Sequence, residues 1–118
     1  SIINIASAHS FVSSAPNNQA AYVASKTGLL GLTRELAAQW ARHEIRVNCI
    51  APGYFPTELT DAMMDEDSSG YGYITKRTPM RRVGRLEELD GALLLLSSDA
   101  STYLTGQTVT VDGGWTMQ

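Results

Sequence analysis

Two short apolar runs on either side of a long helical segment set the fold class. Residues 2–6 and residues 45–51 are rich in β-branched side chains and too short for helices, so we expect both to be strands buried on both faces. The intervening residues 19–42 have the apolar periodicity of a helix. A strand, helix, strand order implies a right-handed crossover, and therefore an α/β fold with an open parallel sheet covered by helices.

The helix expected over residues 19–42 should start at a side-chain cap and pack closely on a neighbour. Asn17 or Asn18 can accept a hydrogen bond from the free amide groups at its start. Gly28 and Gly31 each cost a helix interior about 1 kcal/mol relative to alanine, and glycines in such places usually let another backbone approach. Its buried stripe is expected to consist of Leu29, Leu32, Leu36 and Trp40.

The rest of the chain alternates loops with two further elements. Loop composition covers residues 7–18, and residues 54–78 form an expected mobile acidic loop with no regular periodicity. Residues 86–98 should form a helix and residues 108–111 a strand, followed by a tight turn at residues 112–114. The acidic residues of the long loop include Asp61, Asp65, Glu66 and Asp67, and the apolar face of the later helix includes Leu89, Leu93 and Leu96.

Composition narrows the function classes. The 118 residues suffice for one domain, and a net charge of −3 without runs of like charge gives no footprint for nucleic acid or an anionic membrane. The single cysteine, Cys49, excludes an internal disulfide and suits a reducing compartment, and every apolar run is too short to span a bilayer. We therefore expect a cytoplasmic protein. His9 and His43 stand alone, without metal-ligand spacing, so we expect no metal.

Tyr22 and Lys26 are the pair that points to chemistry. Residues four apart on a helix lie on the same face, so the phenol and the ammonium become neighbours. A nearby cation favours a phenolate, which lets such a pair move a proton at neutral pH. Taken alone the spacing is weak evidence, because a solvated helix face can carry it by chance.

The surrounding motifs give the pair its meaning. In order they are Asn4-Ile5-Ala6-Ser7, Tyr22-x-x-x-Lys26, Arg46-Val47-Asn48-x-Ile50-x-Pro52-Gly53, Thr57 and Thr105-Gly106-x-x-x-x-Val111-Asp112-Gly113-Gly114. This series resembles the C-terminal half of the short-chain dehydrogenase/reductase family, and it covers nearly the whole chain apart from the acidic loop. The resemblance implies a Rossmann-like doubly wound sheet and hydride transfer between a nicotinamide coenzyme and a carbonyl or secondary alcohol.

The resemblance also implies a role for each matched residue. Tyr22 corresponds to the catalytic acid/base, Lys26 to its partner that also bonds the nicotinamide ribose, and Ser7 to the serine that holds the substrate oxygen. Pro52, Gly53, Phe55 and Thr57 correspond to the segment beside the nicotinamide. The family's serine-to-tyrosine spacing lies between those of Ser7 and Ser10, and we favour Ser7 because it directly ends the first strand.

Three parts of the family pattern fall outside these residues, one of them the asparagine on the preceding helix that completes the family's proton relay. The glycine-rich phosphate turn and the residue that selects NAD or NADP both belong to an N-terminal half, so either coenzyme stays open. We expect residues 1–118 to be the C-terminal part of a single domain, and the chain to be a fragment that does not turn over substrate by itself.

Substrate and assembly are less constrained. The motifs Pro52-Gly53-Tyr54-Phe55-x-Thr57-Glu58 and Asp112-Gly113-Gly114-Trp115 are similar to those of polyol, sugar and gluconate dehydrogenases, which favours a sugar, polyol or sugar acid. The 3-oxoacyl carrier-protein reductases share most of the motifs and remain an alternative. A second alternative is a non-catalytic member of the family, in which the fold serves binding or assembly. His9 is expected to be a solvated loop residue, although it could touch substrate. The resemblance further implies a homodimer or homotetramer that pairs the long helix.

Overall fold

The computed structural model describes residues 1–58, 60 and 64–117. The elements, with η marking 3-10 helices, are β1 (Ile2–Ile5), η1 (Ala8–Ser10), α1 (Ala20–Trp40), η2 (Ala41–His43), β2 (Val47–Pro52), α3 (Ser69–Arg77), η3 (Leu86–Leu89), α4 (Asp90–Ser97), η4 (Asp99–Ser101), β3 (Thr108–Val111) and η5 (Trp115–Met117).

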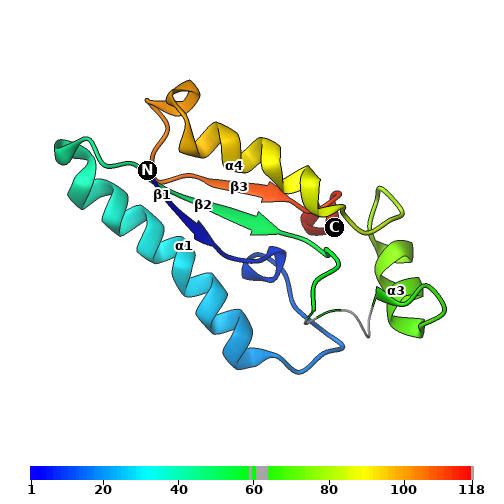
Figure 1. Ribbon diagram of the computed structural model, residues 1–118. Coiled ribbons are helices and arrows are strands. Elements are labelled where there is room, and N and C mark those ends of the chain that lie inside the picture. Colours follow the sequence, from blue (N-terminus) through cyan, green and yellow to red (C-terminus); the bar gives the residue numbers. More distant parts are fainter. Residues whose placement is uncertain (59, 61–63, 118) are drawn as a thin grey trace.

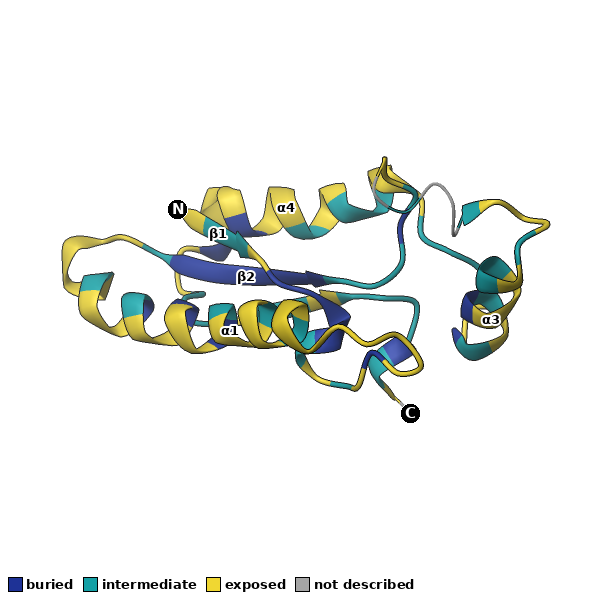
Figure 2. Cartoon of the chain, turned by 90° about the horizontal axis from the view of Figure 1, so that it is seen from below, coloured by how far each residue is buried: buried dark blue, intermediate teal, exposed yellow. Residues whose placement is uncertain are grey.

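A parallel three-stranded sheet forms the centre of the molecule. The strand order is β1-β2-β3, with Ile2 opposite Val47 in the first pair and Cys49 opposite Thr108 in the second. Helix α1 covers one face of the sheet and α4 covers the other (Figures 1 and 2). The α/β fold with a parallel sheet, expected from the strand, helix, strand order, is confirmed.

Burial differs sharply between β2 and β1. Strand β2 lies between the other two strands and is buried along nearly its whole length (Figure 2). Strand β1 lies at the edge of the sheet, and Ile5 is 48% exposed. The expectation that residues 2–6 are buried on both faces is therefore wrong. Asn4 ties this strand to α1, because its side-chain amide donates to the Thr33 hydroxyl at 2.9 Å.

Helix α1 buries its expected stripe only in part: Leu29 packs against the core, and Leu36 and Trp40 are half-buried. Its buried residues are Leu30, Thr33 and Ala37, whereas Leu32 is 46% exposed. The opposing core residues, Ala6, Cys49 and Ala51, are small, and Leu30 of the helix packs against them, with Leu29 partly buried beside it. A methyl group added to Gly28 or Gly31 would have no neighbour within 4 Å, so the expected close approach at these glycines is wrong within the described chain.

The start of α1 also differs from expectation. Its N-cap residue is Gln19, and no side chain caps the first turn. Asn17 is held instead in the preceding loop, where its backbone carbonyl accepts from the Ser14 hydroxyl at 3.0 Å and its amide donates to the Ser14 carbonyl. Capping by Asn17 or Asn18 is therefore wrong.

Part of the expected acidic loop is helical. Helix α3 begins after Ser68, whose hydroxyl accepts from the amide of Tyr71 at 3.0 Å, and it buries Ile74 completely. The description of residues 54–78 as a mobile acidic connection is therefore wrong for this part, because Ile74 provides a packing anchor that Gly70 and Gly72 just before it obscure. Asp61, named in that expected loop, lies outside the described residues.

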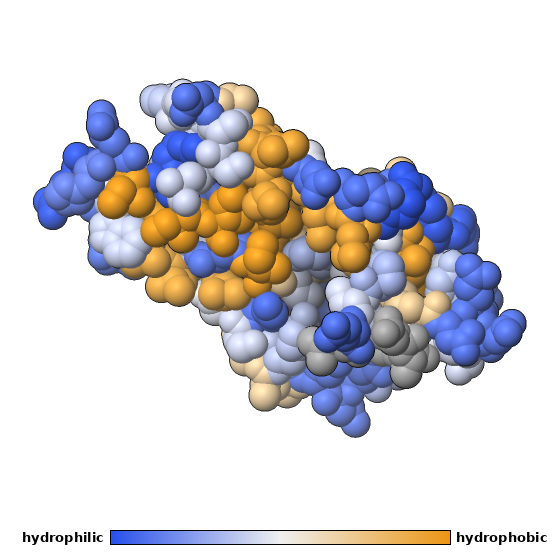
Figure 3. Space-filling model, in the orientation of Figure 1, coloured by the Kyte–Doolittle hydropathy of each residue, from blue (hydrophilic) through white to orange (hydrophobic). Residues whose placement is uncertain are grey.

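An apolar surface extends over α4 and the edge formed by β1 (Figure 3). Within the expected stripe of the later helix, Leu96 is buried but Leu93 is exposed. The exposed members of the surface are Ile2, Ile5, Leu93, Leu94 and Leu95. Across residues 1–58, 60 and 64–117, every helix is too short or too polar to cross a membrane.

Candidate functional site

A cleft opens at the carboxyl ends of β1 and β2, which is where open α/β sheets bind ligands. Its volume is about 580 Å³. All seven residues that the sequence assigned to the site line it: Ser7, Tyr22, Lys26, Pro52, Gly53, Phe55 and Thr57. Residues to which the sequence assigned no role in catalysis or coenzyme binding complete the wall, and among them are His9, Asn17, Gln19, Tyr54, Leu86 and Leu89.

Ser7 sits where β1 turns into η1. It is the N-cap residue of that 3-10 helix, and its buried hydroxyl oxygen accepts from the amide of His9 at 3.1 Å. Because the oxygen acts as the acceptor in this bond, the Ser7 O–H stays available as a donor. The alternative serine, Ser10, lies one turn further on and is not part of the cleft lining.

Tyr22 and Lys26 both face the cleft from the first half of α1. The Lys26 ammonium lies 5.9 Å from the centre of the Tyr22 ring and donates to the carbonyl of Ile5 at 2.9 Å. That bond fixes the cation beside the end of β1 and uses one of its three N–H groups. Tyr22 is 43% exposed, so its phenol is accessible to a ligand.

The turn after β2 forms the opposite wall. Gly53 has room for no side chain, because a methyl group there would lie 2.7 Å from the α-carbon of Asp112. Phe55 is buried, and its ring lies against Gly84 so closely that a methyl group on that glycine would lie 2.3 Å from the ring. Thr57 is exposed, with its hydroxyl 3.0 Å from that of Thr60. Bare backbone, an aromatic ring and a hydroxyl thus follow one another along this wall.

His9 and Tyr54 form a hydrogen-bonded pair in the cleft wall, with His9 buried and Tyr54 half-buried. His9 is only 9% exposed, so its expected position in a solvated loop is wrong. Its Nε2 lies 3.0 Å from the Tyr54 hydroxyl oxygen. Burial lowers the pKa of His9 and raises the pKa of Tyr54, so both side chains are neutral at pH 7. His9 follows Ser7 by two residues and Tyr54 follows Pro52 by two residues, so both come shortly after the end of a parallel strand. That position in the sequence could have predicted that they line the cleft.

Helix α3 covers this region through contacts with Trp115. The Arg77 guanidinium carbon lies 4.6 Å from the centre of the Trp115 ring, and the Tyr73 ring centre lies 6.3 Å from it. The Tyr73 hydroxyl also donates to the carbonyl of Ala15 at 3.3 Å. Trp115 itself is buried within the chain, so it packs between the cleft wall and α3.

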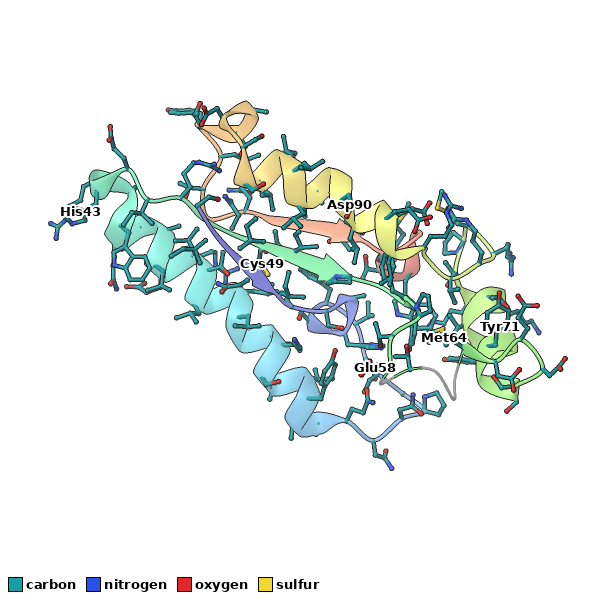
Figure 4. The ribbon with its side chains drawn as sticks, viewed as in Figure 1. His43, Cys49, Glu58, Met64, Tyr71 and Asp90 are labelled. Atoms are coloured by element: carbon teal, nitrogen blue, oxygen red, sulfur yellow. The ribbon has the colours of Figure 1, made fainter. Side chains whose placement is uncertain are left out.

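The two histidines belong to different parts of the fold. His9 lines the cleft, whereas His43 is at the end of η2 and is not part of the cleft lining. Figure 4 shows His43 at the opposite end of the molecule from Glu58. Within the part of the chain that the structure describes, no three side chains of His, Cys, Asp or Glu come together in a way that could hold a metal ion.

Comparison with known proteins shows to which family the chain belongs. A family model described as enoyl-(acyl carrier protein) reductase matches residues 1–116. The chain belongs to the short-chain dehydrogenase/reductase family. Its parallel sheet with a helical layer on each face is the Rossmann-like fold expected of a member.

The similar curated proteins include a sugar-acid dehydrogenase and a carrier-protein reductase. The chain is 42% identical over 116 residues to gluconate 5-dehydrogenase of Gluconobacter oxydans strain 621H, covering 98% of this chain and 44% of the relative. It is 42% identical over 96 residues to the 3-oxoacyl-[acyl-carrier-protein] reductase of Chlamydia trachomatis serovar D, covering 81% of this chain and 38% of the relative.

A solved structure with the same arrangement is that of a gluconate 5-dehydrogenase from Burkholderia cenocepacia J2315 in complex with NADP and tartrate. The TM-score is 0.91 and the identity 44%, and the match covers 99% of this chain and 45% of the other. The chain therefore spans less than half the length of the relatives it matches.

Proposed function

We propose that the protein is a nicotinamide-dependent oxidoreductase that transfers a hydride between the coenzyme and a carbonyl or secondary alcohol of a sugar, polyol or sugar acid. One observation carries the proposal: the hydroxyl of Ser7 and the Tyr22 and Lys26 side chains reach one cleft at the strand ends, although they come from separate elements. Membership of the family and the resemblance to gluconate 5-dehydrogenases support the same reading.

Ser7 and Tyr22 provide the groups that the reaction needs. In reduction, the carbonyl oxygen gains negative charge, which the Ser7 and Tyr22 hydroxyls stabilise before Tyr22 delivers its proton. In oxidation, Tyr22 accepts the proton from the substrate hydroxyl. The Lys26 ammonium, held by the carbonyl of Ile5, favours the phenolate that this second direction requires.

The cleft fits the nicotinamide end of the coenzyme, which supplies or accepts the hydride when bound. Lys26 keeps N–H groups for a ribose hydroxyl, and the Thr57 hydroxyl suits a carboxamide. Pro52 and Gly53 offer a wall without large polar side chains, and Phe55 adds an apolar surface beneath it. We assign these residues to coenzyme binding and favour NADP over NAD, because two similar structures that contain NADP are 44% and 41% identical to this chain, whereas one that contains NADH is 34% identical.

The test measures NADPH oxidation by the protein expressed from its complete coding region. We expect a higher kcat/KM for 5-keto-D-gluconate than for acetoacetyl-coenzyme A, and faster reaction with NADPH than with NADH. The reverse order of substrates would favour the alternative reading, a 3-oxoacyl carrier-protein reductase, which the likeness to the Chlamydia enzyme supports. No oxidation with either substrate would contradict the proposed function.

We further propose that residues 1–118 are the C-terminal part of one larger domain that assembles into a homo-oligomer. The apolar surface over α4 and β1 supports the first statement, because exposed patches of this kind normally have a covering partner. Gly28 and Gly31, open on the outer side of α1, support close packing of that helix against a second copy. The free thiol of Cys49 suits a reducing compartment and supports a cytoplasmic location.

A further inference from the structure

His9 and Tyr54 join the ends of two neighbouring strands at the cleft. His9 lies in η1, directly after β1, and Tyr54 lies in the turn that follows β2. The 3.0 Å hydrogen bond between His9 Nε2 and the Tyr54 hydroxyl therefore bridges the same two strands whose ends hold Ser7 and Pro52. Both side chains line the cleft together with Ser7 and Tyr22.

The pair is held rigidly. The His9 ring meets the Tyr54 and Trp115 rings edge-on, with centres 5.7 Å and 6.1 Å apart, and the Tyr54 and Trp115 centres are 4.8 Å apart. The amide of His9 also donates to the Ser7 hydroxyl. The backbone that carries the imidazole is thereby tied to the serine proposed to hold the reacting oxygen, and the ring contacts reduce the ordering that ligand binding requires.

Its chemistry suits a neutral ligand group that both donates and accepts. Burial is the main reason why the pKa of His9 is lowered and that of Tyr54 raised, and the positive charge of Arg77 further lowers the pKa of His9. After this one hydrogen bond the phenol oxygen keeps an acceptor position, and it also keeps its O–H as a donor in the tautomer whose Nε2–H donates to it. An alkyl chain placed against this pair would leave the phenol oxygen without a further hydrogen-bond partner, which costs binding free energy. A substrate hydroxyl group in the same place would provide that partner.

We propose that His9 and Tyr54 bind a non-reacting hydroxyl of the substrate and so select polyhydroxylated substrates. The inference rests on the proposed function, because Ser7 and Tyr22 must hold the reacting oxygen in the same cleft. A hydrogen bond to a non-reacting hydroxyl is made equally in the ground state and the transition state. Its loss raises KM and leaves kcat nearly unchanged.

The experiment uses the protein expressed from its complete coding region, with NADPH and 5-keto-D-gluconate. Tyr54→Phe and His9→Phe keep an aromatic ring but remove the hydrogen bond, and we expect each to raise KM about threefold to tenfold with kcat unchanged. His9→Gln keeps a side-chain N–H donor and should raise KM less than His9→Phe. The inhibition constant of 2-hexanone, a ketone without neighbouring hydroxyls, should be the same in Tyr54→Phe as in the unaltered protein.

Tyr73→Phe is the matched control. Tyr73 also contacts Trp115, but it does not line the cleft. The KM of the Tyr73→Phe protein for 5-keto-D-gluconate should therefore equal that of the unaltered protein. An unchanged KM in Tyr54→Phe would overturn the inference, as would an inhibition constant for 2-hexanone that rises as much as KM. Absence of activity in the unaltered protein would instead contradict the proposed function, and this inference with it.

Discussion

Replacing Gly53 by alanine tests how tightly the cleft wall is built. A methyl group at this position would lie 2.7 Å from the α-carbon and 2.8 Å from the β-carbon of Asp112. Asp112 cannot easily move away, because its carboxylate accepts from the amide of Gly114 and from both the amide and the hydroxyl of Thr116, at 2.7–2.8 Å. The Gly53 amide also donates to the carbonyl of Val111 at 2.9 Å, so the two strand ends are fixed against each other.

Overpacking of this kind costs about 1–3 kcal/mol. In a domain of 150–250 residues, each kcal/mol lowers Tm by about 2–4 °C, so Gly53→Ala should unfold some 2–12 °C earlier when circular dichroism is followed on heating. The control is Gly72→Ala in α3, where a methyl group meets nothing within 4 Å. That substitution should stabilise the protein by about 0.5–1 kcal/mol, because alanine loses less backbone freedom than glycine on folding. A Gly53→Ala protein as stable as the unaltered one would refute the reasoning.

Three further predictions concern single side chains. Ser7→Ala should lower kcat by about 10²-fold with unchanged NADPH affinity, since it removes one donor to the developing oxyanion; steady-state kinetics and coenzyme titration check this. Arg82 lowers the pKa of Glu88 from 4.5 to about 2 through a side-chain ion pair, so the stability that this pair provides is present above pH 4.5 and is lost as the pH falls through 2. In Glu88→Gln, the free energy of unfolding measured by urea denaturation should change less with pH over that range. The same pH dependence as in the unaltered protein would contradict a stabilising role of the ion pair. Because burial lowers the pKa of His9 below 6.5, the unfolded chain binds the proton more readily and stability should decrease as the pH falls below 6.5; His9→Phe should remove that decrease.

Local spacing was enough to predict the parts of the fold and site that depend on one element at a time. Strand β3 lies where its sequence pattern places it, and α1 covers most of the expected residues 19–42. Tyr22 and Lys26 had to share a helix face because they are four residues apart. Their arrival in the same cleft as Ser7 follows from the parallel crossover, which brings the end of β1 beside the first half of α1.

Features that depend on packing between distant segments could not be predicted in this way. The inward face of α1 depends on its contacts with the sheet beneath it, and Thr33 is buried while Leu32 is exposed. His9 is buried because Tyr54 and Trp115, more than 40 residues away in sequence, close around it. Helix α3 has a polar, glycine-containing sequence and packs on Trp115 through Arg77, a contact that no local pattern reveals.

The central claim is that Tyr22 transfers the proton while the surrounding wall holds the coenzyme, and the kinetics of Tyr22→Phe test it most directly. Removing only the hydroxyl should lower kcat by about 10²–10⁴-fold, because that range is what a positioned acid/base contributes. NADPH affinity, measured by fluorescence titration of the same protein, should stay unchanged, since Lys26, Gly53 and Thr57 are left in place. A Tyr22→Phe protein that reduces 5-keto-D-gluconate at the rate of the unaltered protein would contradict the account.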